Sequence, residues 1–314
     1  MTGLADANAV AARRLAMNGL ARVLLAGVWL LHWLPLPVLA ALGRGLGRGL
    51  HAVGTARRRV ALRNVELCLP ELSEAQRRAL VLEHFQWLAR SLLERSLLWH
   101  ASPARLRRLI RVEGDVHFAE ELWQSEQRAV LWLVPHFLGV DVAGAACQLF
   151  QQRPGVDIYA PQSNPVLDTA LLRGRSRLGH DEFYRRQDGA RAVVRAIKRG
   201  LAFFNPADMD FGARDAAFVP FFGHPAATLL APSRMARGLN MAVQPLVAEM
   251  LPGGQGYVVR FLKPWTDWPT DDPQADAAAM NRFVEQQIRQ CPAQYLWVHK
   301  RFKTRPPGEP SVYL

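Results

Sequence analysis

The sequence has few cysteines and few lysines, and it lacks the common nucleotide and metal motifs. Its three cysteines, Cys68, Cys147 and Cys291, lie far apart and form no CxxC pair, so we expect a reducing compartment and no structural zinc. No GxGxxG, Walker or HExxH motif occurs, so dinucleotide, P-loop and zincin sites have no support. Three further histidines are not spaced as a set of metal ligands: His180, His224 and His299.

Acidic residues are also outnumbered. The formal net charge is +12 and the sequence pI is about 10.5, with arginine carrying most of the positive charge. Such a balance favours anionic partners, which include nucleic acid, acidic lipid headgroups, phosphorylated substrates and acidic proteins. Half of the 314 residues are apolar, enough for a sizeable core in one large domain or two small ones. No internal repeat, low-complexity tract or flexible linker is present.

Charge is absent from residues 23–42, which read VLLAGVWLLHWLPLPVLAAL. About 20 apolar residues is the length that spans a bilayer. Trp29, Trp33 and Pro35 make the run less uniformly apolar than a plain spanning helix. A helix that lies in the interface, or one broken at Pro35, is therefore nearly as well supported as a spanning helix. The long preceding region and the central Pro-Leu-Pro argue against a signal peptide.

Arginines follow this run at once, at Arg44, Arg48 and positions 57–59. If the run spans the membrane, their excess places the rest of the chain in the cytoplasm; if it lies flat, they meet anionic headgroups. We therefore expect residues 1–55 to be a membrane-associated helical segment and residues 56–314 to form the main domain. The glycines of GRGLGRGL at 43–50 follow no strand, and we interpret them as helix-packing residues.

The rest of the chain alternates between helix and strand. Residues 56–111 are predicted helical with breaks at two prolines, and Ser73 with Gln76 is typical of a capping box. Alternation favours one α/β domain with a single mixed central sheet flanked by helices. The predicted strands are 129–134, 156–160, 201–205 and a hairpin of 241–250 with 257–262, with 217–223 as an edge or loop. The later helices are predicted at 140–150, 164–178, 189–199, 228–239 and 280–291.

The most informative stretch is RAVLWLVPHFLGVD at 128–141. A buried strand ends at Pro135, His136 follows in the turn, and Asp141 opens the next helix. Positions i and i+5 lie about 140° apart on one helix, so the two side chains meet only in this turn-and-helix arrangement. They would then lie outside the carboxyl end of a strand, where open α/β sheets bind ligands. A carboxylate on one ring nitrogen would leave the other as a general base.

Several motifs together carry a resemblance to a known family. They are RNVELCLPELSE at 63–74, PHFLGVD at 135–141, GRSRLG at 174–179, DMDFGARDAAFVPFFGHPAAT at 208–228 and AQYLWVHKRFKTRP at 293–306. In this order they resemble the lipid A biosynthesis (lauroyl/myristoyl) late acyltransferases. That family is related to the glycerolipid acyltransferases, which share an H-x4-D/E box and a glycerolipid acyltransferase-like fold. The Pro-His opening of the box favours the lipid A branch.

The resemblance implies an O-acyltransferase that moves a fatty acyl group from acyl carrier protein to a hydroxyl of a lipid A precursor. His136 would take the proton of that hydroxyl, and Asp141 would orient the imidazole. Arg175, with Arg177 as second choice, would stabilise the oxyanion or bind a substrate phosphate. Asp208 and Asp210 would hold those arginines or acceptor hydroxyls. No metal or organic cofactor is implied.

The resemblance also implies a place and partners. The enzyme would work at the cytoplasmic face of the inner membrane, on a phosphorylated glycolipid acceptor, beside membrane lipid and an acidic carrier protein. Phe218, Phe221 and Phe222 are candidates to line an acyl tunnel. The main alternative is an acyltransferase of the same superfamily acting on a lysophospholipid, glycolipid or aminolipid. A basic surface protein that binds nucleic acid is a third hypothesis, and the buried setting of His136 argues against it.

Overall fold

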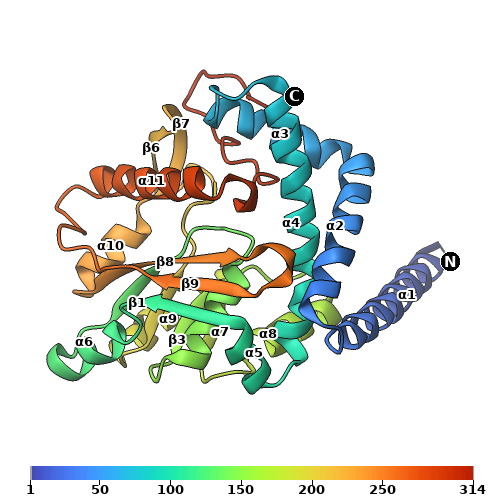
Figure 1. Ribbon diagram of the computed structural model, residues 1–314, viewed down its shortest axis with the longest axis horizontal. Coiled ribbons are helices and arrows are strands. Elements are labelled where there is room, and N and C mark those ends of the chain that lie inside the picture. Colours follow the sequence, from blue (N-terminus) through green and yellow to red (C-terminus); the bar gives the residue numbers. More distant parts are fainter. Residues whose placement is uncertain (1, 314) are drawn as a thin grey trace.

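A computed structural model of the protein describes residues 2–313, and the backbone alone for residues 2–14. Its helices and strands alternate through most of the chain after an all-helical N-terminal part (Figure 1). The α-helices are α1 Thr2–Leu31, α2 Leu36–Val53, α3 Thr55–Cys68, α4 Glu74–His100, α5 Pro103–Leu109, α6 Phe118–Glu126, α7 Val140–Phe150, α8 Pro165–Ser176, α9 Ala190–Lys198, α10 Ala231–Gly238 and α11 Pro273–Gln290. The strands are β1 Ile110–Gly114, β2 Val130–Leu133, β3 Gly155–Tyr159, β4 Glu182–Arg185, β5 Ala202–Asn205, β6 Ala216–Phe221, β7 His224–Leu229, β8 Ala242–Met250 and β9 Tyr257–Phe261.

The central sheet has the strand order β1-β9-β8-β2-β5-β3-β4. All neighbours are parallel except the β8–β9 hairpin, so the predicted mixed sheet of an α/β fold is confirmed. The strands β2 and β5 lie side by side, with Leu131 opposite Phe203. Their carboxyl ends therefore reach the same edge of the sheet, which brings the loops that follow them together.

Both faces of the sheet are covered, as the continuous apolar run of β2 requires. Successive side chains of a strand point to opposite faces. Leu131 and Leu133 pack into a core with α9 and α11, whereas Trp132 and Val134 pack into a second core with α7. Figure 1 shows α11 and α7 on opposite sides of β8 and β9. The sheet is thus a buried, rigid platform for the residues at its edge.

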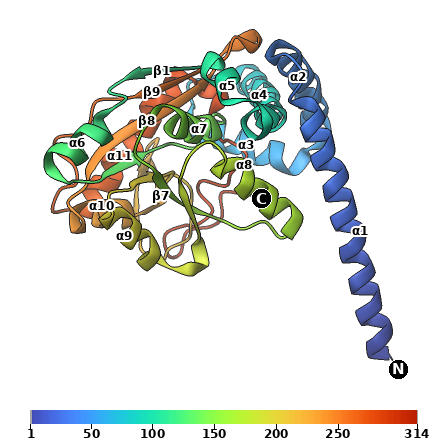
Figure 2. The same ribbon diagram turned by 90° about the horizontal axis from the view of Figure 1, so that it is seen from below.

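The N-terminal helices are broken at Pro35, which stands at the N-cap of α2. Figure 2 shows α1 running away from the body of the protein, while α2 lies along α4. Gly43 and Gly47 face α4 and are buried against Arg90 and Gln86, which confirms the packing role predicted for these two glycines. Within residues 2–313, no helix is both long and apolar enough to cross a bilayer.

Several boundaries differ from those predicted. The helix predicted from residue 228 begins at Ala231, because residues 224–229 pair with β6 as a second strand of an antiparallel hairpin. The final helix starts at Pro273, where Asp272 caps it through the backbone N–H groups of Gln274 and Ala275. The segment predicted helical to residue 111 becomes strand β1 at Ile110. The capping box at Ser73 is confirmed.

Candidate active site

A cavity of about 600 Å³ opens at the edge of the sheet where β2, β3 and β5 end. Most of its wall is apolar, with Phe203 and Phe204 from β5 and Leu98 and Trp99 from the end of α4. An apolar cavity with a few converging polar groups is the usual form of a small-molecule site. The polar residues that line it include His136, Asp141, Gln148, Asp157, Arg175 and Asp181.

His136 lies in the turn between β2 and α7, as predicted, and lines the cavity. Its backbone N–H donates to the two carboxylate oxygens of Asp208 at 3.1 and 3.0 Å, and its Nδ1 lies 2.6 Å from Asp208 Oδ1. An ionised carboxylate can only accept hydrogen bonds, so the proton of the neutral ring is on Nδ1. Nε2 then carries a lone pair, and the hydrogen bonds of residues 2–313 leave it without a protein partner.

Asp208 is almost fully buried, with 2% of its side chain exposed. Burial alone would raise the pKa of its carboxyl group. The charge that His136 carries when it is protonated and the hydrogen bonds that His136 donates outweigh burial, so the pKa of Asp208 lies below its ordinary value. Asp208 is therefore a fixed carboxylate that orients the imidazole and can stabilise its protonated form.

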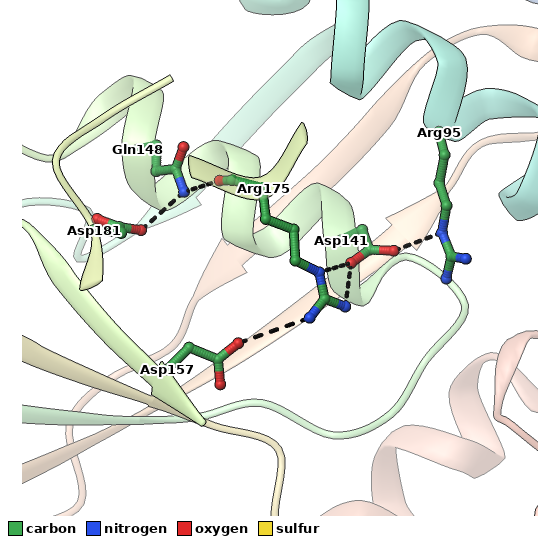
Figure 3. Close-up of polar contacts among 6 residues, drawn as sticks. All are labelled: Arg95, Asp141, Gln148, Asp157, Arg175 and Asp181. Carbon is green, nitrogen blue, oxygen red and sulfur yellow. Dashed lines mark hydrogen bonds and ion pairs between the residues drawn. The ribbon is translucent and has the colours of Figure 1, made fainter. Parts of the chain in front are cut away.

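Asp141 opens α7 as predicted, but it does not contact His136. Its Oδ1 accepts from Arg175 Nε at 3.1 Å and Nη2 at 2.8 Å, and its Oδ2 accepts from Arg95 Nε at 2.7 Å (Figure 3). Burial would raise the pKa of Asp141, but Arg175 and Arg95 hold it well below its ordinary value. Because two guanidinium groups occupy both carboxylate oxygens, the predicted orientation of His136 by Asp141 is wrong. Asp208 takes that place.

Arg175 reaches the cavity from the last turn of α8. Asp141 raises the pKa of its guanidinium most, which more than offsets burial, so Arg175 is a fixed cation. Its third nitrogen, Nη1, lies 4.0 Å from Asp157 Oδ2. The structure thus brings this predicted residue into the site and places it between two carboxyl groups.

Two other predicted residues lie elsewhere. Arg177 Nε donates to the carbonyl of Leu98 at 2.8 Å, and its guanidinium also binds the carbonyl of Ala101, so it satisfies the free carbonyls at the end of α4. Asp210 accepts from Thr304 N at 2.6 Å and Thr304 Oγ1 at 2.8 Å and thereby fastens the C-terminal segment. Neither residue lines the cavity.

The phenylalanines predicted to form an acyl tunnel do not line the cavity either. Phe221 is fully buried and packs against Phe222, Tyr295 and Phe302 in the core. Instead the aromatic wall consists of Trp99, Phe183, Phe203, Phe204 and Phe211. The broken apolar stretch at 217–223 is a hairpin strand, so its side chains pack against α11 and the C-terminal segment.

Sequence reasoning missed Arg95 and Asp157. Arg95 lies on α4, a helix whose many arginines give no sign of which one turns inward. For Asp157 a signal existed, because it is a charged residue inside a short apolar strand. Such a residue in a buried sheet needs a partner, and that partner marks a site.

Fold and site together define an α/β protein with a histidine–carboxylate pair at the edge of a buried sheet and an arginine that lines the same apolar cavity as the histidine. Residues 11–304 match the family model for "Bacterial lipid A biosynthesis acyltransferase", and the chain belongs to this family. The protein is therefore an acyltransferase.

Relatives of known name support this assignment. The lipid A biosynthesis lauroyltransferase of Escherichia coli (strain K12) is 36% identical over 287 residues, which are 91% of this chain and 92% of the relative. The lipid A biosynthesis palmitoleoyltransferase of the same organism is 32% identical over 288 residues, 91% of this chain and 92% of the relative. Its lipid A biosynthesis myristoyltransferase is 31% identical over 277 residues, 88% of this chain and 83% of the relative.

Proposed function

We propose that this protein transfers a fatty acyl chain from acyl carrier protein to a hydroxyl of a phosphorylated lipid A precursor. The observation that carries the proposal is that His136 lines the apolar cavity while the buried Asp208 behind it fixes the proton on Nδ1. The free nitrogen of such an imidazole is a general base within reach of a bound alcohol.

In this reaction the acceptor hydroxyl gives its proton to His136 Nε2 while its oxygen attacks the thioester carbonyl carbon. The tetrahedral intermediate then collapses, the carbon–sulfur bond breaks, and the protonated imidazole returns the proton to the departing thiolate. The buried carboxylate of Asp208 stabilises the imidazolium between these two steps. No covalent acyl-enzyme is needed.

Arg175 is our candidate for the group that stabilises the oxyanion or binds a substrate phosphate. Its guanidinium lines the same cavity as His136, and Asp141 holds it through Nε and Nη2. A donor fixed before the reaction costs no reorganisation when negative charge develops. Asp141 thus supports the site by placing Arg175.

We also propose that residues 1–55 dock on the inner membrane at its cytoplasmic face and that residues 56–314 form the acyltransferase domain. Large apolar side chains of α1 and α2 are exposed to solvent, which is costly unless something covers them. Trp33, in the turn between α1 and α2, is 67% exposed. Arg48 is exposed on α2, the helix that also carries Val38, Leu42 and Leu46. The exposed apolar side chains include Trp29, Trp33, Val38, Leu42 and Leu46. Tryptophan and arginine suit the boundary between headgroups and acyl chains.

The purified protein with acyl-carrier thioester and a lipid A precursor tests the proposal, with mass spectrometry of the product lipid. We expect wild type to add one acyl chain and His136→Ala to lose nearly all of this transfer while keeping its circular dichroism spectrum. Offering the labelled thioester to a total membrane extract then identifies the acceptor. A label on lysophospholipid or aminolipid, with none on lipid A precursor, would contradict the proposed substrate.

A further inference from the structure

Asp157 is a carboxyl group in a place where a charge is costly. It is the third residue of β3 and lies in register with Phe204 of β5 and Phe183 of β4. Its side chain is 13% exposed and lines the cavity. Oδ1 is buried and accepts no hydrogen bond from the described residues, and Oδ2 lies 4.0 Å from Arg175 Nη1. Nothing in the transfer mechanism above uses this carboxyl group.

We propose that Asp157 is a positioning residue for Arg175, which it holds from the side opposite Asp141, and that the proton on Asp157 sets the charge Arg175 offers to the substrate. This inference rests on the role proposed above for Arg175. Asp141 already binds two of the three guanidinium nitrogens, Nε and Nη2. Nη1 is the nitrogen left for a substrate oxygen, and Asp157 is the protein group beside it (Figure 3).

The net charge around Arg175 depends on whether Asp157 carries a proton. Arg95 and Arg175 are cations and Asp141 is an anion, so the three carry a net charge of +1 when Asp157 is neutral. Ionised Asp157 brings the cluster to zero and competes with a substrate oxygen for Nη1. In a cavity of low dielectric constant, one charge at this distance changes the field strongly.

The surroundings of Asp157 raise its pKa towards neutral pH. Burial raises the pKa of Asp157 to about 7, and the nearby charge of Arg175 offsets burial only in part. The charged groups that face it are Arg175 from α8, Asp141 from α7 and His136 from the turn before α7. The basic residues of α9, which also packs on β3, are exposed on the surface: Arg191, Arg195 and Lys198.

Ionisation of Asp157 should give the wild-type enzyme a pH dependence that a variant without this carboxyl group lacks. As the pH rises above about 7, wild-type kcat/KM falls several-fold, because Asp157 ionises and takes up the charge of Arg175. Asp157→Asn keeps the shape and stays neutral, so its profile lacks this fall. Asp267→Asn, which changes an exposed carboxyl group outside the cavity, serves as the control and follows wild type. A merely structural Asp157 would lower the rate equally at every pH.

Infrared spectroscopy tests the same proton without measuring turnover. Protonated Asp157 should give a carboxyl C=O stretching band in wild type that the Asp157→Asn variant lacks. This band should disappear as the pH rises through about 7. In Arg175→Gln the midpoint should move to higher pH, because Arg175 favours the ionised form. Overlapping rate profiles of wild type and Asp157→Asn, or an unmoved midpoint in Arg175→Gln, would overturn the inference. If wild type shows this coupled titration but transfers no acyl chain, the proposed function is contradicted and the coupling between Asp157 and Arg175 still holds.

Discussion

His136 Nδ1 lies 2.6 Å from Asp208 Oδ1, although 72 residues separate the two in the chain. The contact exists because β2 and β5 are parallel neighbours and each residue lies in the loop that follows its strand. Asp141, five residues from His136, is instead bound by Arg95 and Arg175. Proximity in sequence therefore gave the wrong partner, and the topology of the sheet gives the right one.

A first prediction separates the two arginines of the GRSR motif. Arg175→Gln should lower kcat about 10²–10³-fold, the loss typical of removing one oxyanion donor. Arg177→Gln is the matched control, because its side chain binds carbonyls at the end of α4 and does not line the cavity. We expect Arg177→Gln to lower the thermal midpoint while the rate per folded molecule stays near wild type. Equal loss of turnover in both variants would contradict the assignment.

Much of the fold could be predicted because the strands are short apolar runs and the helices have a clear period. The helix predicted at residues 140–150 coincides with α7, and the hairpin of β8 and β9 is confirmed. The errors lie where tertiary pairing decides. Residues 224–229 form a strand only because β6 supplies its hydrogen-bond partners.

The site was predictable only in part. His136 follows from its place after a buried strand, and Asp208 from the end of a second strand. Their pairing, however, depends on which strands are neighbours and on the two guanidinium groups that occupy Asp141. Charged donors compete for a carboxylate more strongly than a neutral imidazole does. No spacing in the sequence reveals that competition.

A second prediction concerns the packing of α2 on α4. A Cβ atom on Gly47 would lie 2.4 Å from the Cα of Gln86, whereas Gly45 and Gly49 have no atom of another segment within 4 Å of such a Cβ. Gly47→Ala should therefore destabilise the protein by about 1–3 kcal/mol. Gly49→Ala should be neutral or stabilising by up to about 1 kcal/mol, because alanine favours the helix. Chemical denaturation measures both, and a harmless Gly47→Ala would show that α2 does not pack as described.

A third prediction concerns acid stability. His84 is fully buried, its Nδ1 lies 3.1 Å from the carbonyl oxygen of Ala293, and burial lowers its pKa from 6.5 to about 4. The unfolded chain therefore takes up this proton first, and the free energy of unfolding falls as the pH drops from about 6.5 to about 4. The loss due to His84 is roughly 3 kcal/mol.

Denaturation at several pH values checks this prediction. His84→Gln should make the pH dependence of the unfolding free energy shallower across this window, whatever its effect at neutral pH; His299, whose pKa burial also lowers to about 4, keeps the rest. His117→Gln is the control, because the His117 side chain is 58% exposed. If His84→Gln and wild type lose stability in parallel on acidification, burial of a neutral His84 is not what limits acid stability.

The central claim is that His136 and Asp208 act as one unit in acyl transfer. A double-mutant cycle measures this most directly, with kcat determined for His136→Ala, Asp208→Asn and the double variant. Asp208→Asn should lower kcat about 10³–10⁴-fold, as loss of the orienting carboxylate does in other histidine-based sites. The double variant should then be no slower than His136→Ala alone. Losses that multiply in the double variant, or an Asp208→Asn variant that turns over like wild type, would contradict the account.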